Sequence, residues 1–383
     1  MPSVTGSLLL IPLFFLVFGL SATVDVRAAW RERERYKRGV VCGLCCQFVL
    51  LPFIGFCVVK AFDLGELVGV TLLVVTSSPG GSYSNFWCSI LNADLALSVA
   101  MTAASTVLSV AFLPLNLLIW VNLAYARGAT SDLRWEGLFA GIAVVILAVG
   151  SGLLASYALE DGAKASRAAR ARNACNTLGQ VSGLALMAAS ALVSSRDEPI
   201  WDKKPSFYVA CATPFALGLL LSLAAAKVAR LEGPERCAVA VECAYQNPGI
   251  ATTVALNMFE GDRASRAVGV PLYYGIVEAF GIGVFLLIAW KRGMTHAPAD
   301  APLLAVLRKN WQEINKREAA ARDVEVPPPA PPVGGDAGVE AAAAVDDVAV
   351  DDVAVDDVAV EPAAPLVAAP DEGPEAQDAC AVA

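Results

Sequence analysis

Glu242, Gln246 and Asn247 lie close together, directly before Pro248, in the otherwise apolar stretch of residues 241–259. Such a stretch is typical of a membrane-spanning segment, where a carboxylate costs several kcal/mol unless it is paired, neutralised or in contact with water. Carboxylate and amide oxygens are hard ligands of the kind that hold a small cation such as Na⁺. The pattern therefore predicts that Glu242 has a functional role at membrane depth.

A second polar interruption, the sequence SSPGGSYSN, lies in the apolar stretch of residues 66–91. Pro79 removes a backbone donor, and Gly80 and Gly81 add conformational freedom, so we expect the helix to unwind there. Backbone groups that are freed inside a membrane must be buried in protein or line a watery cavity. Two interrupted helices in separate halves of a chain indicate a secondary transporter with its site near the membrane midplane.

Neighbouring apolar segments supply further oxygen atoms. They come from Gln47, Ser98, Thr102, Ser105 and Thr106. Taken singly, a serine or threonine in such a helix more often bonds to a carbonyl of its own helix than to an ion. Together with the carboxylate of Glu242, the set favours ion binding.

The composition places the chain in a membrane. Of its 383 residues, 56% are hydrophobic and 17% are charged, whereas soluble domains have about 25% charged residues. Apolar runs of about 20 residues, the length that crosses the hydrocarbon core, recur along the first three quarters of the chain. We count nine, at residues 6–25, 39–60, 66–91, 95–121, 135–158, 173–194, 206–229, 237–258 and 268–290. The sequence therefore predicts an all-α polytopic membrane protein with about nine transmembrane helices.

The charged loops predict its orientation. The first apolar segment has the length of a signal-peptide core, but six Lys and Arg residues follow it, between positions 27 and 38. The loops after the fifth and seventh segments are also basic. By the positive-inside rule we expect the N-terminus outside and the C-terminus in the cytoplasm. We expect a multi-pass protein of the plasma membrane.

We expect three regions along the chain. Residues 1–292 form the membrane domain. Residues 293–323 follow as a cytoplasmic juxtamembrane helix or linker, in which apolar residues from Leu303 to Trp311 have helical spacing, and both a solvated and a lipid-facing helix fit. Residues 324–383 contain a Pro-rich run and an acidic repeat of period five, which matches neither a helix face nor a strand face, so we predict a disordered tail. The net charge of −9 comes mainly from this tail and implies no nucleic-acid partner.

Other residue types give weaker signals. Cys42, Cys45 and Cys46 have CxxC spacing, but they lie in an apolar span without nearby histidine or charge, so packing is the expected role. The single histidine, His296, lies just outside the last span, and we expect it to be solvated. No recognisable motif combines a nucleophile, a base and oxyanion donors, so we do not expect an enzyme.

Three separated motifs resemble, in order, stretches of the bile acid:sodium symporter family. They are CQFVLLPFIGF, SSPGGSYSNFWCSILNADLALSVAMTAASTVL and ECAYQN. The resemblance covers nearly the whole membrane domain and leaves out the tail. It implies an inverted-repeat transporter with two crossed discontinuous helices, in which spans two to four and seven to nine form a core domain and spans one, five and six a panel. Nine spans with an external N-terminus are similar to the animal members of the family.

The resemblance also implies two sodium sites that share one carboxylate. The first would be formed by Ser84, Asn85, Ser98, Thr102 and Glu242. The second would be formed by Gln47, Glu242 and Gln246, with backbone carbonyls near Cys243 and Tyr245.

This chain departs from the family pattern at three positions. Ala244 replaces a glycine, and Tyr245 is bulkier than the usual residue, which bears on how closely the two helices can cross. Glu278 stands where a glutamine is common, and it adds a second intramembrane acid. Glu278 fits either a role with substrate or protons or a place facing water near a cavity.

These features together predict a sodium-coupled symporter that imports an organic anion, such as a bile acid or a steroid sulfate, with two Na⁺ per substrate. One carboxylate shared by two Na⁺ leaves a net positive charge, which the anion would offset. Two alternatives stay open: a non-transporting membrane sensor or scaffold of the same fold, and a proton-coupled carrier that uses Glu278.

Overall fold

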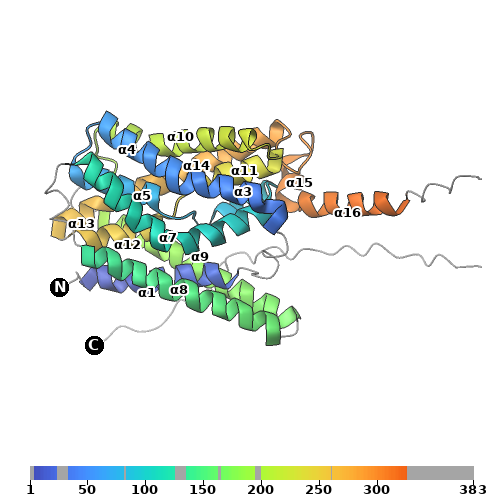
Figure 1. Ribbon diagram of the computed structural model, residues 1–383, viewed down its shortest axis with the longest axis horizontal. Helices are drawn as coiled ribbons and strands as arrows, with labels where there is room; N and C mark the ends of the chain where they lie inside the picture. The colour runs from blue at the N-terminus through green and yellow to red at the C-terminus, as the bar shows by residue number, and fades with distance from the viewer. Residues whose placement is uncertain are drawn as a thin grey trace, which may run out of the picture. The chain divides into compact units, whose positions relative to one another are not determined.

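The computed structural model describes residues 4–23, 33–81, 83–125, 135–162, 165–194, 200–259 and 261–325. The regular elements of these residues are helices, apart from one isolated β-bridge. They belong to one compact unit, Met1–Pro327 (Figure 1). The predicted disordered tail falls almost entirely outside the described residues, so it stays a prediction.

Each of the nine predicted spans corresponds to one helix or to a consecutive group of helices. The helices are α1 (Val4–Ala22), α3 (Arg33–Cys45) continued by the π-helical turn η1 (Cys46–Leu50) and α4 (Leu51–Ala61), α5 (Glu66–Ser77) with α6 (Ser84–Ile90), α7 (Leu95–Ala124), α8 (Trp135–Gly162), α9 (Ala165–Ser194), α10 (Pro205–Val228), α11 (Gly233–Ala244) with α12 (Pro248–Met258), and α13 (Gly261–Ala267) with α14 (Gly269–Lys291).

Five of the described helices are long and apolar enough to cross a membrane. They are Glu34–Ala61, Leu95–Ala124, Phe139–Leu159, Pro205–Val228 and Asp262–Lys291. Two shorter apolar helices, Leu8–Ala22 and Glu66–Ser77, accompany them. The two interrupted spans do not qualify as single helices because each is divided into short halves. The chain is thus an all-α, multi-pass integral membrane protein, as predicted.

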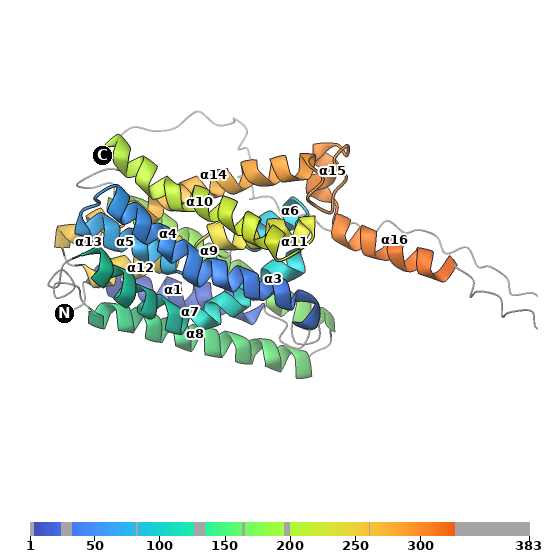
Figure 2. The same cartoon turned by 45° about the horizontal axis from the view of Figure 1, so that its top comes forward.

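The helices pack in two groups. Helix α1 packs along both α8 and α9, and these three lie together in both views (Figures 1 and 2). Most of the other membrane helices pack among themselves, with α10 against α11, α5 against α7, and α4 against α5. This matches the expected division into a panel and a core domain.

The two interrupted spans cross at their breaks. Helix α5 ends at Ser77, and Ser78 is extended, while α11 ends at Ala244 and Tyr245 is extended. Gly80 and Gln246 form an antiparallel bridge, and the amide N of Gly81 donates to the carbonyl of Tyr245 at 2.9 Å. Backbone groups freed by the two breaks thus satisfy one another inside the protein, as the membrane requires.

The second half of the eighth span, α12, begins with suitable residues. Pro248 occupies the first turn of α12, where its missing N–H is no loss. Asn247 caps the same helix, because its Oδ1 accepts the amide of Ile250 at 3.0 Å.

Gln47 lies in the π-helical turn η1, an irregularity that is frequent at functional sites.

The segment after the last span forms two short helices, α15 (Leu303–Arg308) and α16 (Trp311–Glu325). The apolar residues Leu303, Leu304 and Leu307 face outward, with 46%, 58% and 38% of their surface exposed, whereas Val306 is fully buried.

The expectation that His296 is solvated is wrong. Its ring is half-buried, its Nε2 is enclosed, and this burial lowers the pKa of His296 below its ordinary value.

Candidate functional site

Glu242 lies in the last turn of α11 and is the centre of a cluster of hydroxyl groups. Its Oε1 accepts hydrogen bonds from Ser84 Oγ at 2.6 Å and from Ser98 Oγ at 3.1 Å. The hydroxyl of Thr102 donates to the same oxygen. The carboxylate therefore connects α11 to the start of α6 and to the first turns of α7.

Asn85 completes the cluster from α6. Its Oδ1 lies 2.8 Å from Ser98 Oγ and 3.4 Å from Thr102 Oγ1, so the single proton of each hydroxyl can bond either to this amide oxygen or to the carboxylate. The structure thus brings together all five side chains predicted for the first sodium site. Each hydroxyl can donate its proton to the carboxylate and still turn a lone pair toward a cation.

The electrostatics of this cluster favour a cation. Glu242 is only 1% exposed, and no described residue donates a hydrogen bond to its Oε2. Among the described residues, no Lys, Arg or His forms an ion pair with it. A buried carboxylate without a compensating charge is costly. A cation held by the surrounding oxygen atoms would remove that cost.

A second cluster of amides lies beside the crossing. Gln47 Nε2 donates to the carbonyl of Ser78 at 2.8 Å and to Gln246 Oε1 at 2.9 Å. Gln246 Nε2 donates to the carbonyl of Cys243 at 2.7 Å. Both glutamines are buried. The two glutamines predicted for the second sodium site thus meet. Glu242, the third predicted side chain, bonds instead to the hydroxyls of the first cluster.

The carbonyl of Tyr245, also predicted for the second site, has a different partner. It accepts the amide of Gly81 in the crossing, which leaves it one lone pair. The departures from the family pattern fit this crossing. Ala244 is fully buried, and its carbonyl accepts the Tyr274 hydroxyl at 3.4 Å.

Ser78 belongs to this second cluster, although it was not among the predicted sodium ligands. Besides its carbonyl, which accepts from Gln47, its Oγ lies 3.3 Å from Gln246 Oε1. The amide of Asn247 donates to the same Oγ at 3.4 Å. The available signal was its place directly before Pro79, at the start of the break.

Glu278, on α14, contacts the crossing from another side. It is fully buried rather than facing water, and its Oε2 accepts the amide of Gln246 at 2.9 Å. No described residue bonds to its Oε1. Glu278, the second intramembrane acid, therefore bonds directly to the backbone of Gln246, a predicted sodium ligand.

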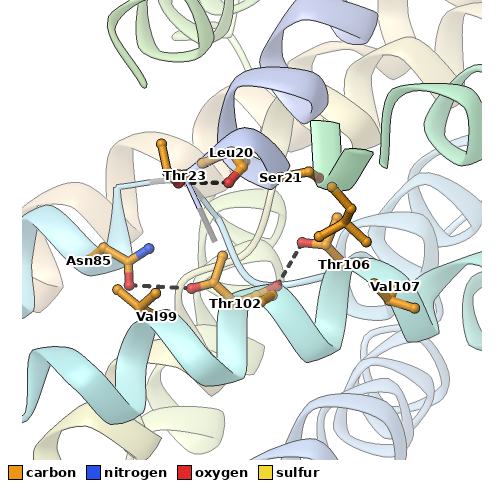
Figure 3. Close-up of a pocket in the computed structure, with 10 residues that line it drawn as sticks. Leu20, Ser21, Thr23, Asn85, Val99, Thr102, Thr106 and Val107 are labelled. Atoms are coloured by element: carbon orange, nitrogen blue, oxygen red, sulfur yellow. Dashed lines mark hydrogen bonds between the residues drawn. The ribbon is translucent and has the colours of Figure 1, made fainter. Parts of the chain in front are cut away.

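A small cavity lies against the first cluster (Figure 3). Its free volume is about 20 Å³, room for about one water molecule. Asn85, Thr102 and Thr106 form its wall on the side of the core, while Ser21 and Thr23 of the α1 segment line the opposite side. The cavity therefore lies between the two helix groups and shares residues with the carboxylate cluster.

The cysteines contribute to packing. Cys46 and Cys243 are buried with Leu51 in a small apolar cluster, against which Cys42 also packs. This agrees with the packing role expected for Cys42 and Cys46, whereas Cys45 is exposed. In the part of the chain that the structure describes, no group of three or more His, Cys, Asp or Glu residues is arranged to hold a metal ion.

Comparison with known proteins shows what this chain is similar to. The sequence model of the sodium bile acid symporter family matches residues 10–193. The ileal sodium/bile acid cotransporter of Homo sapiens is 24% identical over 302 residues, which cover 78% of this chain and 84% of that protein.

Two further relatives carry related names. The sodium-dependent organic anion transporter of Bos taurus is 24% identical over 277 residues, or 72% of this chain and 70% of that protein. Sodium/bile acid cotransporter 4 of Homo sapiens is 36% identical over a shorter stretch of 110 residues, 28% of this chain and 25% of that protein.

Proposed function

We propose that this chain, which is similar to the sodium bile acid symporter family, is a sodium-coupled symporter for an organic anion such as a bile acid or a steroid sulfate. The observation that carries the proposal is the convergence of α6, α7 and α11 on the buried carboxylate of Glu242, beside the crossing of two broken helices.

In the proposed mechanism, two Na⁺ are cargo that orders the crossing. The first would take oxygen atoms from Ser84, Asn85, Ser98, Thr102 and Glu242, whose side chains already bond to one another. The second would lie among Gln47, Gln246, Glu242 and the backbone carbonyls near Cys243 and Tyr245. Because these residues come from separate helices, the ions would stabilise one arrangement of the core.

Charge balance would couple the ions to the substrate. Two Na⁺ and one carboxylate leave one net positive charge, which a monovalent organic anion offsets. The amino-terminal end of α12, which begins beside the crossing, would favour the same negative charge. Two Na⁺ with one such anion carry one net charge, so transport would be electrogenic, with about 2.3 kcal/mol per 100 mV of membrane potential.

The small cavity beside Asn85 and Thr102 marks the proposed place of the anionic end of the substrate, which would need the two helix groups to move apart. These two residues belong both to the cavity wall and to the first cluster. A substrate there would contact the core on one side and the α1 segment on the other. Relative movement of the two helix groups would then carry the substrate together with its ions.

The proposed orientation has the N-terminus outside and the C-terminus in the cytoplasm of a plasma-membrane protein. The basic segment between positions 27 and 38 supports it through the positive-inside rule. Substrate and ions bound from outside would then be released into a cytoplasm that is low in sodium.

The proposal is tested by uptake of a labelled bile salt and a labelled steroid sulfate into cells that express the protein. We expect at least one compound to enter in sodium buffer and not in choline buffer. Absence of sodium-dependent uptake of both, with the protein detected at the cell surface, would contradict these substrates. Sodium-dependent thermal stabilisation without any uptake would instead favour a sensor or scaffold.

Truncation of Gln47 to alanine tests the second ion site. The change removes the donor to Ser78 and Gln246, and with it the side-chain oxygen proposed for the ion. We expect about tenfold more sodium for half-maximal uptake, which corresponds to ~1.4 kcal/mol, and a Hill coefficient that falls toward one. The control is Asn122→Ala. It truncates an exposed amide near the C-terminal end of α7, whereas the predicted ion ligands Ser98 and Thr102 lie near the start of that helix. Unchanged sodium dependence in Gln47→Ala would contradict the assignment.

Replacement of Glu278 with glutamine separates sodium coupling from proton coupling. The Gln oxygen can still accept the amide of Gln246, so the crossing should persist, while the ionisable group is lost. We expect Glu278→Gln to keep uptake that is driven by a sodium gradient. If uptake instead follows a pH gradient in sodium-free buffer and the substitution abolishes it, the protein is a proton-coupled carrier.

A further inference from the structure

The segment of residues 294–315, here named the C-terminal clasp, packs against the turn that joins α6 to α7. We infer that this clasp, through Asn92 in the turn, positions the residues of the first sodium site. Asn92 is thus a positioning residue rather than an ion ligand. The inference rests on the proposed function of that site.

Asn92 is built into the contact. It is 3% exposed and has left-handed backbone geometry, with φ of 58°. Its Nδ2 donates to the carbonyl of Val306 at 2.9 Å, and its Oδ1 accepts the amide of Trp311, also at 2.9 Å. Its backbone carbonyl accepts the amide of His296 at 2.8 Å. One residue therefore makes three hydrogen bonds to the clasp.

These partners explain why an amide side chain is needed. Val306 lies near the end of α15, where carbonyls lack an intrahelical donor, and Trp311 is the first residue of α16, where amides lack an acceptor. The donor half of the Asn92 amide satisfies the first helix end and its acceptor half satisfies the second. The amide offers the donor and the acceptor on two separate atoms, whereas a hydroxyl has both on one oxygen.

The clasp also contacts the start of α7. Asp94 caps this helix by accepting the amide of Leu97 at 2.9 Å. The amide of Leu95 is accepted by Gln312 of the clasp at 3.3 Å. The clasp therefore supplies one of the acceptors that the first turn of α7 requires.

The clasp is in turn held to the rest of the core. Trp290, near the end of α14, donates from Nε1 to the carbonyl of Pro298 at 2.8 Å. Within the clasp, Asn315 donates to the carbonyl of His296 at 3.1 Å. Val306 and Ala297 are 0% and 2% exposed. These contacts make the clasp a packed part of the domain rather than a solvated linker.

The position of the turn connects this contact to the ion site. Helix α6 has 7 residues, so it spans only about 10 Å. Ser84 and Asn85 are the first residues of α6, and the turn that contains Asn92 follows this helix. Ser98 and Thr102 lie in the first helical turns of α7, directly after that turn. The turn also touches the start of α11, since the amide of Asp94 donates to the carbonyl of Pro234 at 3.2 Å. Fixing the turn therefore fixes the spacing of the ligand-bearing helices.

The variant that isolates this role is Asn92→Gly. Glycine adopts left-handed geometry without strain, so the substitution removes the two side-chain bonds and keeps the backbone conformation. The matched control is Asn310→Gly in the clasp itself. It removes an exposed cap bond to the amide of Glu313, a change that costs only a few tenths of a kcal/mol at a helix start.

The measurement is thermal unfolding of the purified full-length chain as sodium replaces choline at constant ionic strength. We expect Asn92→Gly to need about fivefold more sodium than wild type for half-maximal stabilisation, and Asn310→Gly to match wild type. An unchanged sodium requirement in Asn92→Gly would overturn the inference, even if the variant unfolds at a lower temperature without sodium, because a purely structural role lowers only that temperature.

Two further outcomes decide the matter. If Asn92→Gly does not fold, Gln312→Ala replaces it, with an expected increase of about twofold, and an unchanged requirement again overturns the inference. If sodium does not stabilise wild type at all, the proposed sodium site itself is contradicted, and the inference fails with it. The wild-type titration thus separates failure of the clasp from failure of the proposed function.

Discussion

Replacing Glu242 with glutamine is expected to abolish sodium-dependent uptake while the amount of protein at the cell surface stays near that of wild type. Glutamine keeps the shape of the side chain and one oxygen that can accept from Ser84, Ser98 and Thr102. It removes the negative charge that two cations would share. Loss of one partner from a buried charge pair costs about 3–5 kcal/mol, which is at least ~100-fold in sodium affinity.

Surface labelling and uptake measured in the same cells check this result. The control is Glu235→Gln, in the first turn of the same helix. Its carboxylate accepts the amide of Glu232 at 2.9 Å, and a glutamine can do the same in a capping box. We expect the control to transport like wild type. Sodium-dependent uptake at the wild-type level in Glu242→Gln would remove Glu242 from both ion sites.

Adding a single methyl group at Gly81 is expected to be nearly as damaging. A Cβ at this position would lie 2.2 Å from the carbonyl oxygen of Gln246 and 2.7 Å from the ring of Tyr245. The first contact is with backbone, so a rotamer change cannot relieve it, and the two breaks must separate. Overpacking of this kind costs typically about 1–3 kcal/mol. Because the second cluster lies beside the contact, we expect uptake to fall by more than ~10-fold and the unfolding temperature to drop.

Gly150→Ala is the matched control for this substitution. Gly150 lies in α8, and a Cβ there would meet no atom within 4 Å. Alanine also favours a helix more than glycine does. Uptake and stability should therefore match or exceed those of wild type. If Gly81→Ala behaves like Gly150→Ala, the close crossing of the two breaks is not required for transport.

The breaks could be predicted from sequence because their causes are local. A proline followed by two glycines, or a carboxylate and two amides before Pro248, is unfavourable in a lipid-facing helix wherever the chain folds. The oxygen-bearing side chains could be recognised by residue type, whereas their division into two predicted sodium sites came from the family resemblance. The crossing itself depends on contact between remote segments, Gly80 with Gln246, and only the family resemblance indicated it in advance.

The parts that could not be predicted depend on tertiary contact alone. Asn92 is one amide in a short turn, and nothing in its neighbourhood indicates that it holds two helices more than 200 positions away. The sequence around His296 predicts a solvated side chain, although its backbone amide bonds to the carbonyl of Asn92. The apolar spacing around α15 was recognised, but periodicity does not tell which residues pack, and Val306 is buried instead of Leu304.

The most direct test of the sodium-coupling claim uses purified protein in liposomes that contain no other transporter. Labelled bile salt is supplied outside, with sodium either only outside or at equal concentration on both sides. The account predicts transient accumulation above the equilibrium level under the inward sodium gradient, increased by an inside-negative potential, and simple equilibration without the gradient. The same equilibration under both conditions, in vesicles where the protein does transport the bile salt, would contradict sodium coupling.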